Sequence, residues 1–283
     1  MVVSMPCRGC RGHLTDPKRL SEPASRPAAL CPDARNFNRG VPYCWRALPP
    51  PEGKPSALGL PLRGLFFAGR CRYTASVSVS PRFIQPCEPT LRDRLPKGEG
   101  WRYEVKFDGY RMQVHKAGSS VTLYTRNGAD WTDRFPHLAS ALTSLPCSSA
   151  IIDAELVHAD GFEQLHRQVH KRLEDGLGLW GFDLMLLNGD DLRAVALEDR
   201  KRRLSHLIKK AGVGCLFDSE AFTNGEGLLL ECGSRGLEGV VAKHRASIYR
   251  SGRSVSWVKV KCPAWREANR NRSELYRRDG APR

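Results

Sequence analysis

The chain of 283 residues has few acidic side chains and no long apolar segment. Asp and Glu number 30 against 45 Lys and Arg, which gives a formal net charge of +15. No segment approaches the roughly 20 apolar residues of a membrane-spanning helix, and the N-terminus lacks the apolar stretch of a secretory signal. We therefore expect neither a membrane protein nor a secreted one, and predict a cytoplasmic protein.

The shortage of acidic residues favours a polyanionic partner, with nucleic acid ahead of an anionic membrane surface. The excess charge is uneven: it is +8 in residues 1–80, +2 in 81–258 and +5 in 259–283. Because the central segment is almost neutral, any basic surface on it must come from local placement of cations.

Residues 1–80 differ in kind from the rest of the chain. They hold 11 of the 19 prolines and show almost no regular hydrophobic period, so we expect a low-complexity, mostly irregular segment. Cys7 and Cys10 form a CxxC pair, but Cys31 and Cys44 lie too far apart to complete a regular zinc ribbon. A disulfide framework is not expected.

An orderly pattern begins at Pro81. Apolar and polar residues alternate across Trp101–His115, on both sides of Asp108-Gly109, a dipeptide typical of a hairpin turn. Alternation predicts further strands, and a period near 3.6 predicts helices. The strands are expected over 121–126, 150–157, 237–243 and 256–262, and the helices over 162–173, 197–211 and 225–234.

Charged residues collect on one face of two of these strands. Glu104, Lys106 and Asp108 point the same way, as do Asp153 and Glu155. A lysine held away from water can become a nucleophile, although an ion-paired strand lysine is the commoner use of this residue.

The spacing of these residues resembles a known family. Glu104-Val-Lys106-Phe-Asp108-Gly109-Tyr-Arg111 is similar to the signature ExKxDGxR of the covalent nucleotidyltransferases, which include ATP-dependent DNA ligases, RNA ligases and mRNA capping enzymes. Further signatures follow in the family's order: Arg126-Asn127-Gly128, Asp153-Ala-Glu155, Phe182-Asp183-Leu184, Glu238-Gly-Val-Val-Ala-Lys243 and Trp257-Val-Lys259-Val-Lys261. The connecting text, such as FDLMLLNGDDLR, resembles bacterial DNA ligases of the ligase C and ligase D type.

The resemblance implies an α+β nucleotidyltransferase (ATP-grasp-like) fold, with antiparallel sheets and flanking helices around an ATP cleft. It implies an adenylation domain over 81–262. The residues of 263–283 themselves predict a short basic helix and tail. Ligases usually continue into an OB-fold domain, and the 263–283 tail is too short for a five-stranded barrel, so no C-terminal OB-fold is expected.

The same resemblance implies a reaction and its groups. Lys106 would attack ATP and form a lysyl-AMP intermediate, and Lys259 and Lys261 would bind the triphosphate. Glu155 and Glu238 would hold Mg²⁺ or Mn²⁺, since hard carboxylate oxygens suit these ions, and Glu155 would also contact the ribose.

The remaining implied roles concern the nucleoside and the DNA. Glu104 would read the adenine edge, Phe182 would stack on the base, and Arg111 would hold the ribose. Arg126 would meet the 5′-phosphate of a nick, and Arg253 would contact the DNA backbone.

Three other interpretations rest on strand parity and charge. Asp153 shares the face of Glu155 and is expected to support it. Lys243 has the opposite strand parity to Glu238, so the two cannot face the same pocket without a bulge, and Lys243 is assigned no role. The charged run at 201–203 on the predicted third helix is interpreted as a solvated face.

We therefore predict an ATP-dependent DNA ligase catalytic domain that seals nicked double-stranded DNA in repair or recombination. We expect a monomer associated with the bacterial nucleoid, with a repair protein as a candidate supplier of a DNA clamp. Two alternatives stay open: an RNA ligase or capping-type nucleotidyltransferase, and an inactive DNA-binding module.

Overall fold

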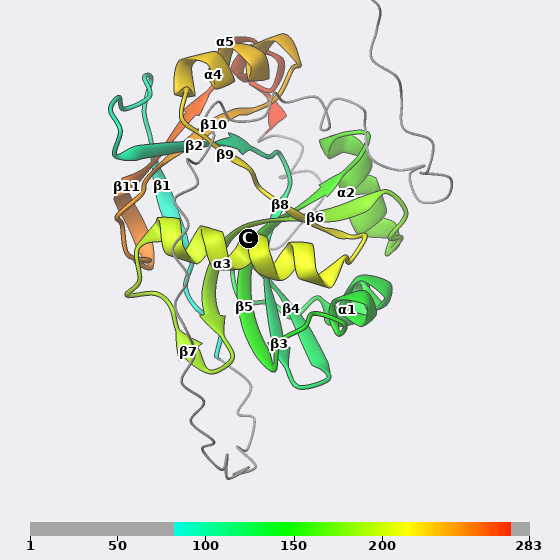
Figure 1. The fold of residues 1–283 in the computed structure, drawn as a ribbon. Helices are drawn as coiled ribbons and strands as arrows, with labels where there is room; N and C mark the ends of the chain where they lie inside the picture. Colours follow the sequence, from blue (N-terminus) through cyan, green and yellow to red (C-terminus); the bar gives the residue numbers. More distant parts are fainter. Residues whose placement is uncertain (1–81, 273–283) are drawn as a thin grey trace, which may run out of the picture. The chain divides into compact units, whose positions relative to one another are not determined.

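The computed structural model describes residues 82–272, which form two β-sheets and five α-helices (Figure 1). The segment predicted to be irregular, 1–80, and residues 273–283 of the predicted tail lie outside the described residues. No described helix is long and apolar enough to cross a membrane.

The first sheet has five strands in the order β1-β11-β10-β2-β9. Their bounds are Cys87–Leu91 (β1), Gly252–Lys261 (β11), Gly239–His244 (β10), Trp101–Lys106 (β2) and Ala221–Phe222 (β9). All neighbours are antiparallel except β1, which runs parallel to β11. The predicted strands near 101, 237 and 256 are therefore neighbours in one sheet.

The second sheet has the order β4-β3-β5-β6-β7, with β8 added beside β6. Its strands are Tyr110–Ala117 (β3), Ser120–Thr125 (β4), Ser149–His158 (β5), Leu177–Leu187 (β6), Asp190–Asp191 (β7) and Leu216–Asp218 (β8). The chain thus contributes β8 to this sheet and, two residues later, β9 to the other.

Five α-helices of the described residues pack on a sheet or, in one case, on another helix. They are Pro136–Leu142 (α1), Phe162–Lys171 (α2), Leu197–Ala211 (α3), Gly225–Ser234 (α4) and Pro263–Ala268 (α5). A 3₁₀ turn at Thr132–Arg134 precedes α1. The helices predicted over 197–211 and 225–234 have the observed bounds of α3 and α4. The apolar stripe of α3 packs on the second sheet.

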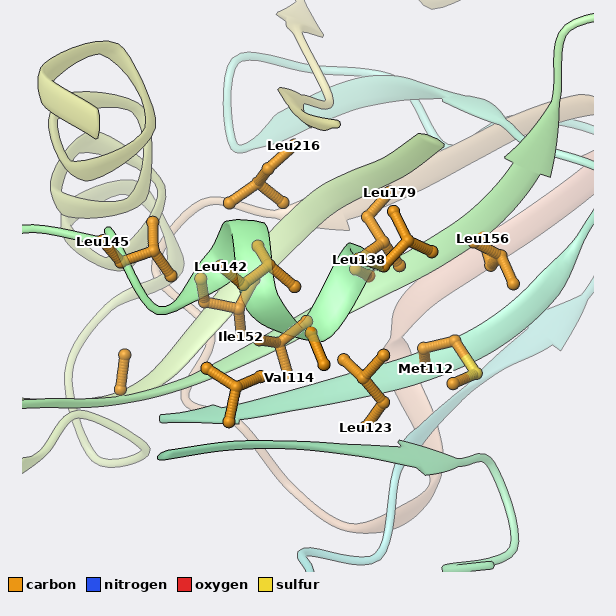
Figure 2. Close-up of a cluster of buried hydrophobic side chains, with 14 of the residues drawn as sticks. Met112, Val114, Leu123, Leu138, Leu142, Leu145, Ile152, Leu156, Leu179 and Leu216 are labelled. Carbon is orange, nitrogen blue, oxygen red and sulfur yellow. The ribbon is translucent and has the colours of Figure 1, made fainter. Parts of the chain in front are cut away.

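The main core lies between the second sheet and helices α1, α2 and α3. Figure 2 shows its side chains, including Val114, Ile152 and Leu142, which are almost completely buried. A second cluster joins the first sheet to α4. A third, which includes Ile151, Tyr249 and Trp257, has members from both sheets and packs their inner faces together.

The predicted hairpin at Asp108-Gly109 is wrong. β2 pairs with β9 and β10, whereas β3 pairs with β4 and β5, so the chain crosses from one sheet to the other at this dipeptide. The crossing brings Gly109 against the backbone of β5, where a Cβ atom would lie 2.1 Å from the carbonyl oxygen of Leu156. Glycine is required here by close approach of two backbones.

We expect Gly109→Ala to destabilise the fold by at least about 2 kcal/mol, because the neighbouring atom is a backbone atom that cannot rotate away. Urea unfolding followed by circular dichroism measures this change. Gly214→Ala is the matched control, since no atom lies within 4 Å of its Cβ position. Equal midpoints for the two variants would contradict the proposed close approach.

Candidate active site

The candidate site is built on the inner face of the first sheet. Residues that pair directly across antiparallel strands share a face. Lys106 pairs with Gly239, which pairs with Lys261, and Glu104 pairs with Val241, which pairs with Lys259. Three lysines and one glutamate predicted from the sequence therefore lie on one face of three adjacent strands.

Glu238 holds two of these lysines. Lys106 Nζ donates to Glu238 Oε2 at 2.7 Å, and Lys261 Nζ lies 2.8 Å from Glu238 Oε1. Glu238 is buried, while Lys106 and Lys261 keep 21% and 27% of their side chains exposed. The two ammonium groups can therefore meet a ligand from the solvent side while one carboxylate compensates their charge.

Lys259 is a third cation beside this arrangement. Burial lowers its pKa, and the nearby charges of Lys106, Lys261 and Arg126 lower it further. No carboxylate lies within ion-pair distance of Lys259 in the part of the chain that the structure describes. Such a concentration of positive charge is suited to a polyanion such as a triphosphate.

Glu155 approaches from the second sheet. Desolvation raises the pKa of its carboxyl from 4.5 to about 7, and Lys106 and Arg111 only partly offset this effect. Glu155 pairs with Arg111 across β5 and β3. The carboxyl is thus placed opposite the lysines with a proton affinity suited to neutral pH.

Arg111 and Phe182 lie together near Glu155. Arg111 forms a bidentate pair with Asp153, at 2.9 and 2.6 Å, and its guanidinium carbon lies 5.3 Å from the centre of the Phe182 ring. Burial disfavours the charged guanidinium, but Asp153 more than offsets this and raises the pKa of Arg111. Asp153, expected to support Glu155, instead holds Arg111 and accepts from the Tyr249 hydroxyl at 2.7 Å.

Glu104 is bound by Lys243, and the parity argument against Lys243 is wrong. Lys243 Nζ donates to Glu104 Oε2 at 2.9 Å and to the Phe182 carbonyl at 3.1 Å. Lys243 lies within β10 and points to the inner face. Glu238 precedes the strand, so the alternation of side chains between the two faces of β10 does not fix its direction. Both side chains therefore reach the space between the sheets.

Arg126 and Arg253 lie outside the cleft and are both exposed. Arg126 Nη2 donates to Glu88 Oε1 at 2.6 Å, and Glu88 pairs in register with Arg253 across β1 and β11. Arg126 lowers the pKa of Glu88. The structure thus brings the two predicted DNA-contacting arginines to one surface beside Lys259.

The family described as "ATP dependent DNA ligase domain" matches residues 81–261, well over half of the sequence. The chain belongs to this family. The predicted family and the α+β nucleotidyltransferase fold are confirmed, and the RNA ligase, capping-enzyme and inactive-module alternatives are not favoured.

The ligase domain is similar to several larger proteins. It is 39% identical over 188 residues to the multifunctional non-homologous end joining protein LigD of Pseudomonas aeruginosa, covering 64% of this chain and 22% of that protein. It is 31% identical over 212 residues to a DNA ligase of Sulfophobococcus zilligii, covering 65% and 35%. The chain therefore spans between a fifth and two fifths of these curated relatives.

Solved structures agree with the fold. A mycobacterial DNA ligase D complexed with ATP and MES matches with a TM-score of 0.54 and 29% identity, over 62% of this chain and 59% of that one. The ligase domain of Mycobacterium tuberculosis LigD matches with the same TM-score and identity, over 62% and 60%.

The sequence left some residues of the ligase cleft unpredicted. Tyr249 and Trp257 are buried between the sheets, and Lys201 of α3 reaches Glu104 although it was interpreted as solvated. A signal for Lys201 was present: Leu197, Arg200, Lys201 and Leu204 share one helical face, so the apolar stripe includes both cations. The exposed neighbour Arg202 fits the original interpretation.

A cavity of about 650 Å³ adjoins Lys106 in the ligase domain. Asp108, Glu238, Trp265 and Arg272 contribute to its wall. Residues 262–272 therefore border the cleft: Arg272 donates to Asp108 at 2.5 Å, and Lys261 Nζ lies 4.3 Å from the centre of a Trp265 ring.

The raised pKa of Glu155 predicts a dependence of stability on pH. Glu155 ionises near 4.5 in the unfolded chain and near 7 in the fold, so between these values the fold binds more protons and loses stability as pH rises. Between about pH 5 and about pH 8, we expect the wild type to lose more free energy of unfolding than Glu155→Gln. The difference between the two losses should be at most about 3 kcal/mol. Urea unfolding at the two pH values measures it.

Glu163→Gln, at an exposed position of α2, is the control for this experiment and should follow the wild type. Parallel losses in wild type and Glu155→Gln would show that Glu155 is not the titrating group.

Proposed function

We propose that the protein carries out the nucleotidyl-transfer steps of an ATP-dependent DNA ligase. Lys106 Nζ attacks the α-phosphorus of ATP, a phosphorus–nitrogen bond forms, and the bond to the bridging oxygen breaks to release pyrophosphate. AMP then passes to the 5′-phosphate of a nick, and the adjacent 3′-hydroxyl displaces it to seal the strand. The observation that carries the proposal is the placement of Lys106 between Glu238 and a cluster of cations.

Glu238 is suited to receive the proton that Lys106 loses. Its Oε2 already accepts from Lys106 Nζ at 2.7 Å, within the distance needed for proton transfer. Lys259 and Lys261 stabilise negative charge that develops on the phosphate oxygens, which is the main requirement of phosphoryl transfer.

The nucleoside part of ATP fits between the sheets. Phe182 presents a ring for stacking, Arg111 and Glu155 lie near it for the ribose, and Glu104 offers a carboxylate to the base edge. Arg111 is held by Asp153, so its guanidinium is oriented before a ligand arrives.

A divalent cation fits Glu155 and Glu238. Among the residues described, no three or more His, Cys, Asp or Glu side chains lie close enough together to hold a metal ion by themselves. Mg²⁺, however, commonly binds one or two carboxylates and completes its coordination shell with water and phosphate. When bound, Mg²⁺ or Mn²⁺ would neutralise charge on the phosphate oxygens.

The DNA substrate would meet the exposed surface of Arg126 and Arg253. The names of the LigD relatives connect those proteins with non-homologous end joining. This supports DNA repair as the process, with nicked double-stranded DNA as the substrate. We infer that the domain acts at the nucleoid as a monomer, with a repair protein as a candidate for clamping DNA.

Removal of the Lys106 ammonium tests the proposed nucleophile. With radiolabelled ATP and Mg²⁺, the full chain should form an acid-labile AMP adduct, and Lys106→Ala should form none. Denaturing gels measure the label. Lys209→Ala, at an exposed position of α3, should label like the wild type. An adduct that persists in Lys106→Ala would contradict the assignment of the nucleophile.

Removal of either exposed arginine tests the proposed DNA surface. Arg126→Ala and Arg253→Ala should each weaken binding to a nicked duplex and lower the salt dependence by about one released counterion. Fluorescence anisotropy at several salt concentrations measures both quantities. Arg167→Ala, on the exposed face of α2, should leave the slope unchanged. Lysine labelling without DNA should persist in all three variants.

A further inference from the structure

Lys201 of helix α3 lies beside the carboxylate of Glu104. Lys201 Nζ lies 3.7 Å from Glu104 Oε2, and its side chain is only 12% exposed. The same nitrogen donates to the carbonyl oxygen of Ser219 at 2.5 Å and to Asp218 Oδ1 at 3.3 Å. Because Ser219 directly follows β8, Lys201 joins the helix, the second sheet and β2 at one point.

Among the described residues, the polar contacts of the Glu104 carboxylate all involve one of its two oxygens. Oε2 accepts from Ser219 Oγ at 2.8 Å and from Lys243 Nζ at 2.9 Å, and it also faces Lys201. Oε1 is buried and has no hydrogen-bond partner among residues 82–272. A buried carboxylate oxygen without a donor is costly, so a ligand between the sheets that brings a hydrogen-bond donor to Oε1 would relieve this cost.

The two lysines at Glu104 are not equivalent. Lys243 lies between aromatic rings, 4.7 Å from the centre of Phe182 and 4.4 Å from that of Trp257, and burial lowers its pKa. Burial also opposes the charge of Lys201, but Glu104 and Asp218 outweigh it and raise the pKa. Lys201 is therefore the more persistent compensating charge for Glu104.

We propose that Lys201 is a positioning residue for base selection. It acts through Glu104: with Ser219 and Lys243 it fixes Oε2, so that Oε1 faces the cleft as a hydrogen-bond acceptor. Adenine carries an amino donor at the position where guanine carries a carbonyl acceptor, so this orientation favours ATP over GTP. The proposal rests on the proposed adenylylation of Lys106.

The test measures nucleotide discrimination in Lys201→Met, which keeps an unbranched side chain shorter by one atom and removes its charge. Single-turnover labelling of the full chain with ATP or GTP gives a half-saturating concentration and a maximal rate. We expect the half-saturating ATP concentration to rise about tenfold, with a smaller change in maximal rate, and the ATP-to-GTP preference to fall about tenfold. Lys201→Arg should restore much of the preference.

Two further variants isolate the contact. Arg202→Met changes the next residue of α3, whose side chain is 73% exposed and pairs with Asp199, and should behave like the wild type. In a Glu104→Gln background, Lys201→Met should cause no additional loss of preference. A lower maximal rate and melting temperature, with preference and half-saturation unchanged, would assign Lys201 a purely structural role and overturn the proposal.

Calorimetric binding of ATP and GTP to Lys106→Ala separates this inference from the proposed reaction. This background has no nucleophile, so it reports base selection without chemistry. If the wild type forms no adduct, the proposed reaction fails, yet a tenfold loss of binding preference from Lys201→Met would still support base selection. Unchanged preference in this background would refute the role of Lys201, whatever the labelling result.

Discussion

The cleft depends on the direct crossing of the chain between two sheets at Phe107–Gly109. β2 ends at Lys106 in one sheet and β3 begins at Tyr110 in the other, so Lys106, the proposed nucleophile, lies where the sheets meet. Only a residue without a Cβ atom allows the backbone to pass Leu156 at this distance. Every other group of the site is placed relative to this crossing: Lys259 and Lys261 by register on one side, Arg111 and Glu155 on the other.

Charge compensation makes such a crowded cleft possible. Buried charges are expensive unless they are paired, and most of the buried or half-buried cations of the cleft have a carboxylate partner. Glu238 forms ion pairs with Lys106 and Lys261. Asp153 pairs with Arg111, and Glu104 pairs with Lys243. Lys259 differs, because its neighbours are mostly cations, and it therefore contributes positive potential to the cleft.

Much of this arrangement could be predicted from the sequence, because strand alternation and motif order are local properties. The spacing of Lys259 and Lys261 identified two cations on one face, and the bounds of α3 followed from its apolar stripe. Partners across the fold could not be predicted. A dipeptide typical of a hairpin does not reveal that its flanking strands join different sheets, and parity does not apply to Glu238, which precedes its strand. The pairing of Arg111 with Asp153 depends on β3 and β5 being neighbours in the sheet. No local sequence pattern predicts that these two strands pair.

The segment from β8 to β9 has a further consequence. Its first strand pairs with β6 in one sheet and its second with β2 in the other, with only Ser219 and Glu220 between them. This short link and the crossing at Gly109 connect the two sheets covalently at two places. The two connections restrict movement of one sheet relative to the other. The groups that surround a nucleotide are therefore preorganised, and less conformational entropy is lost when the ligand binds.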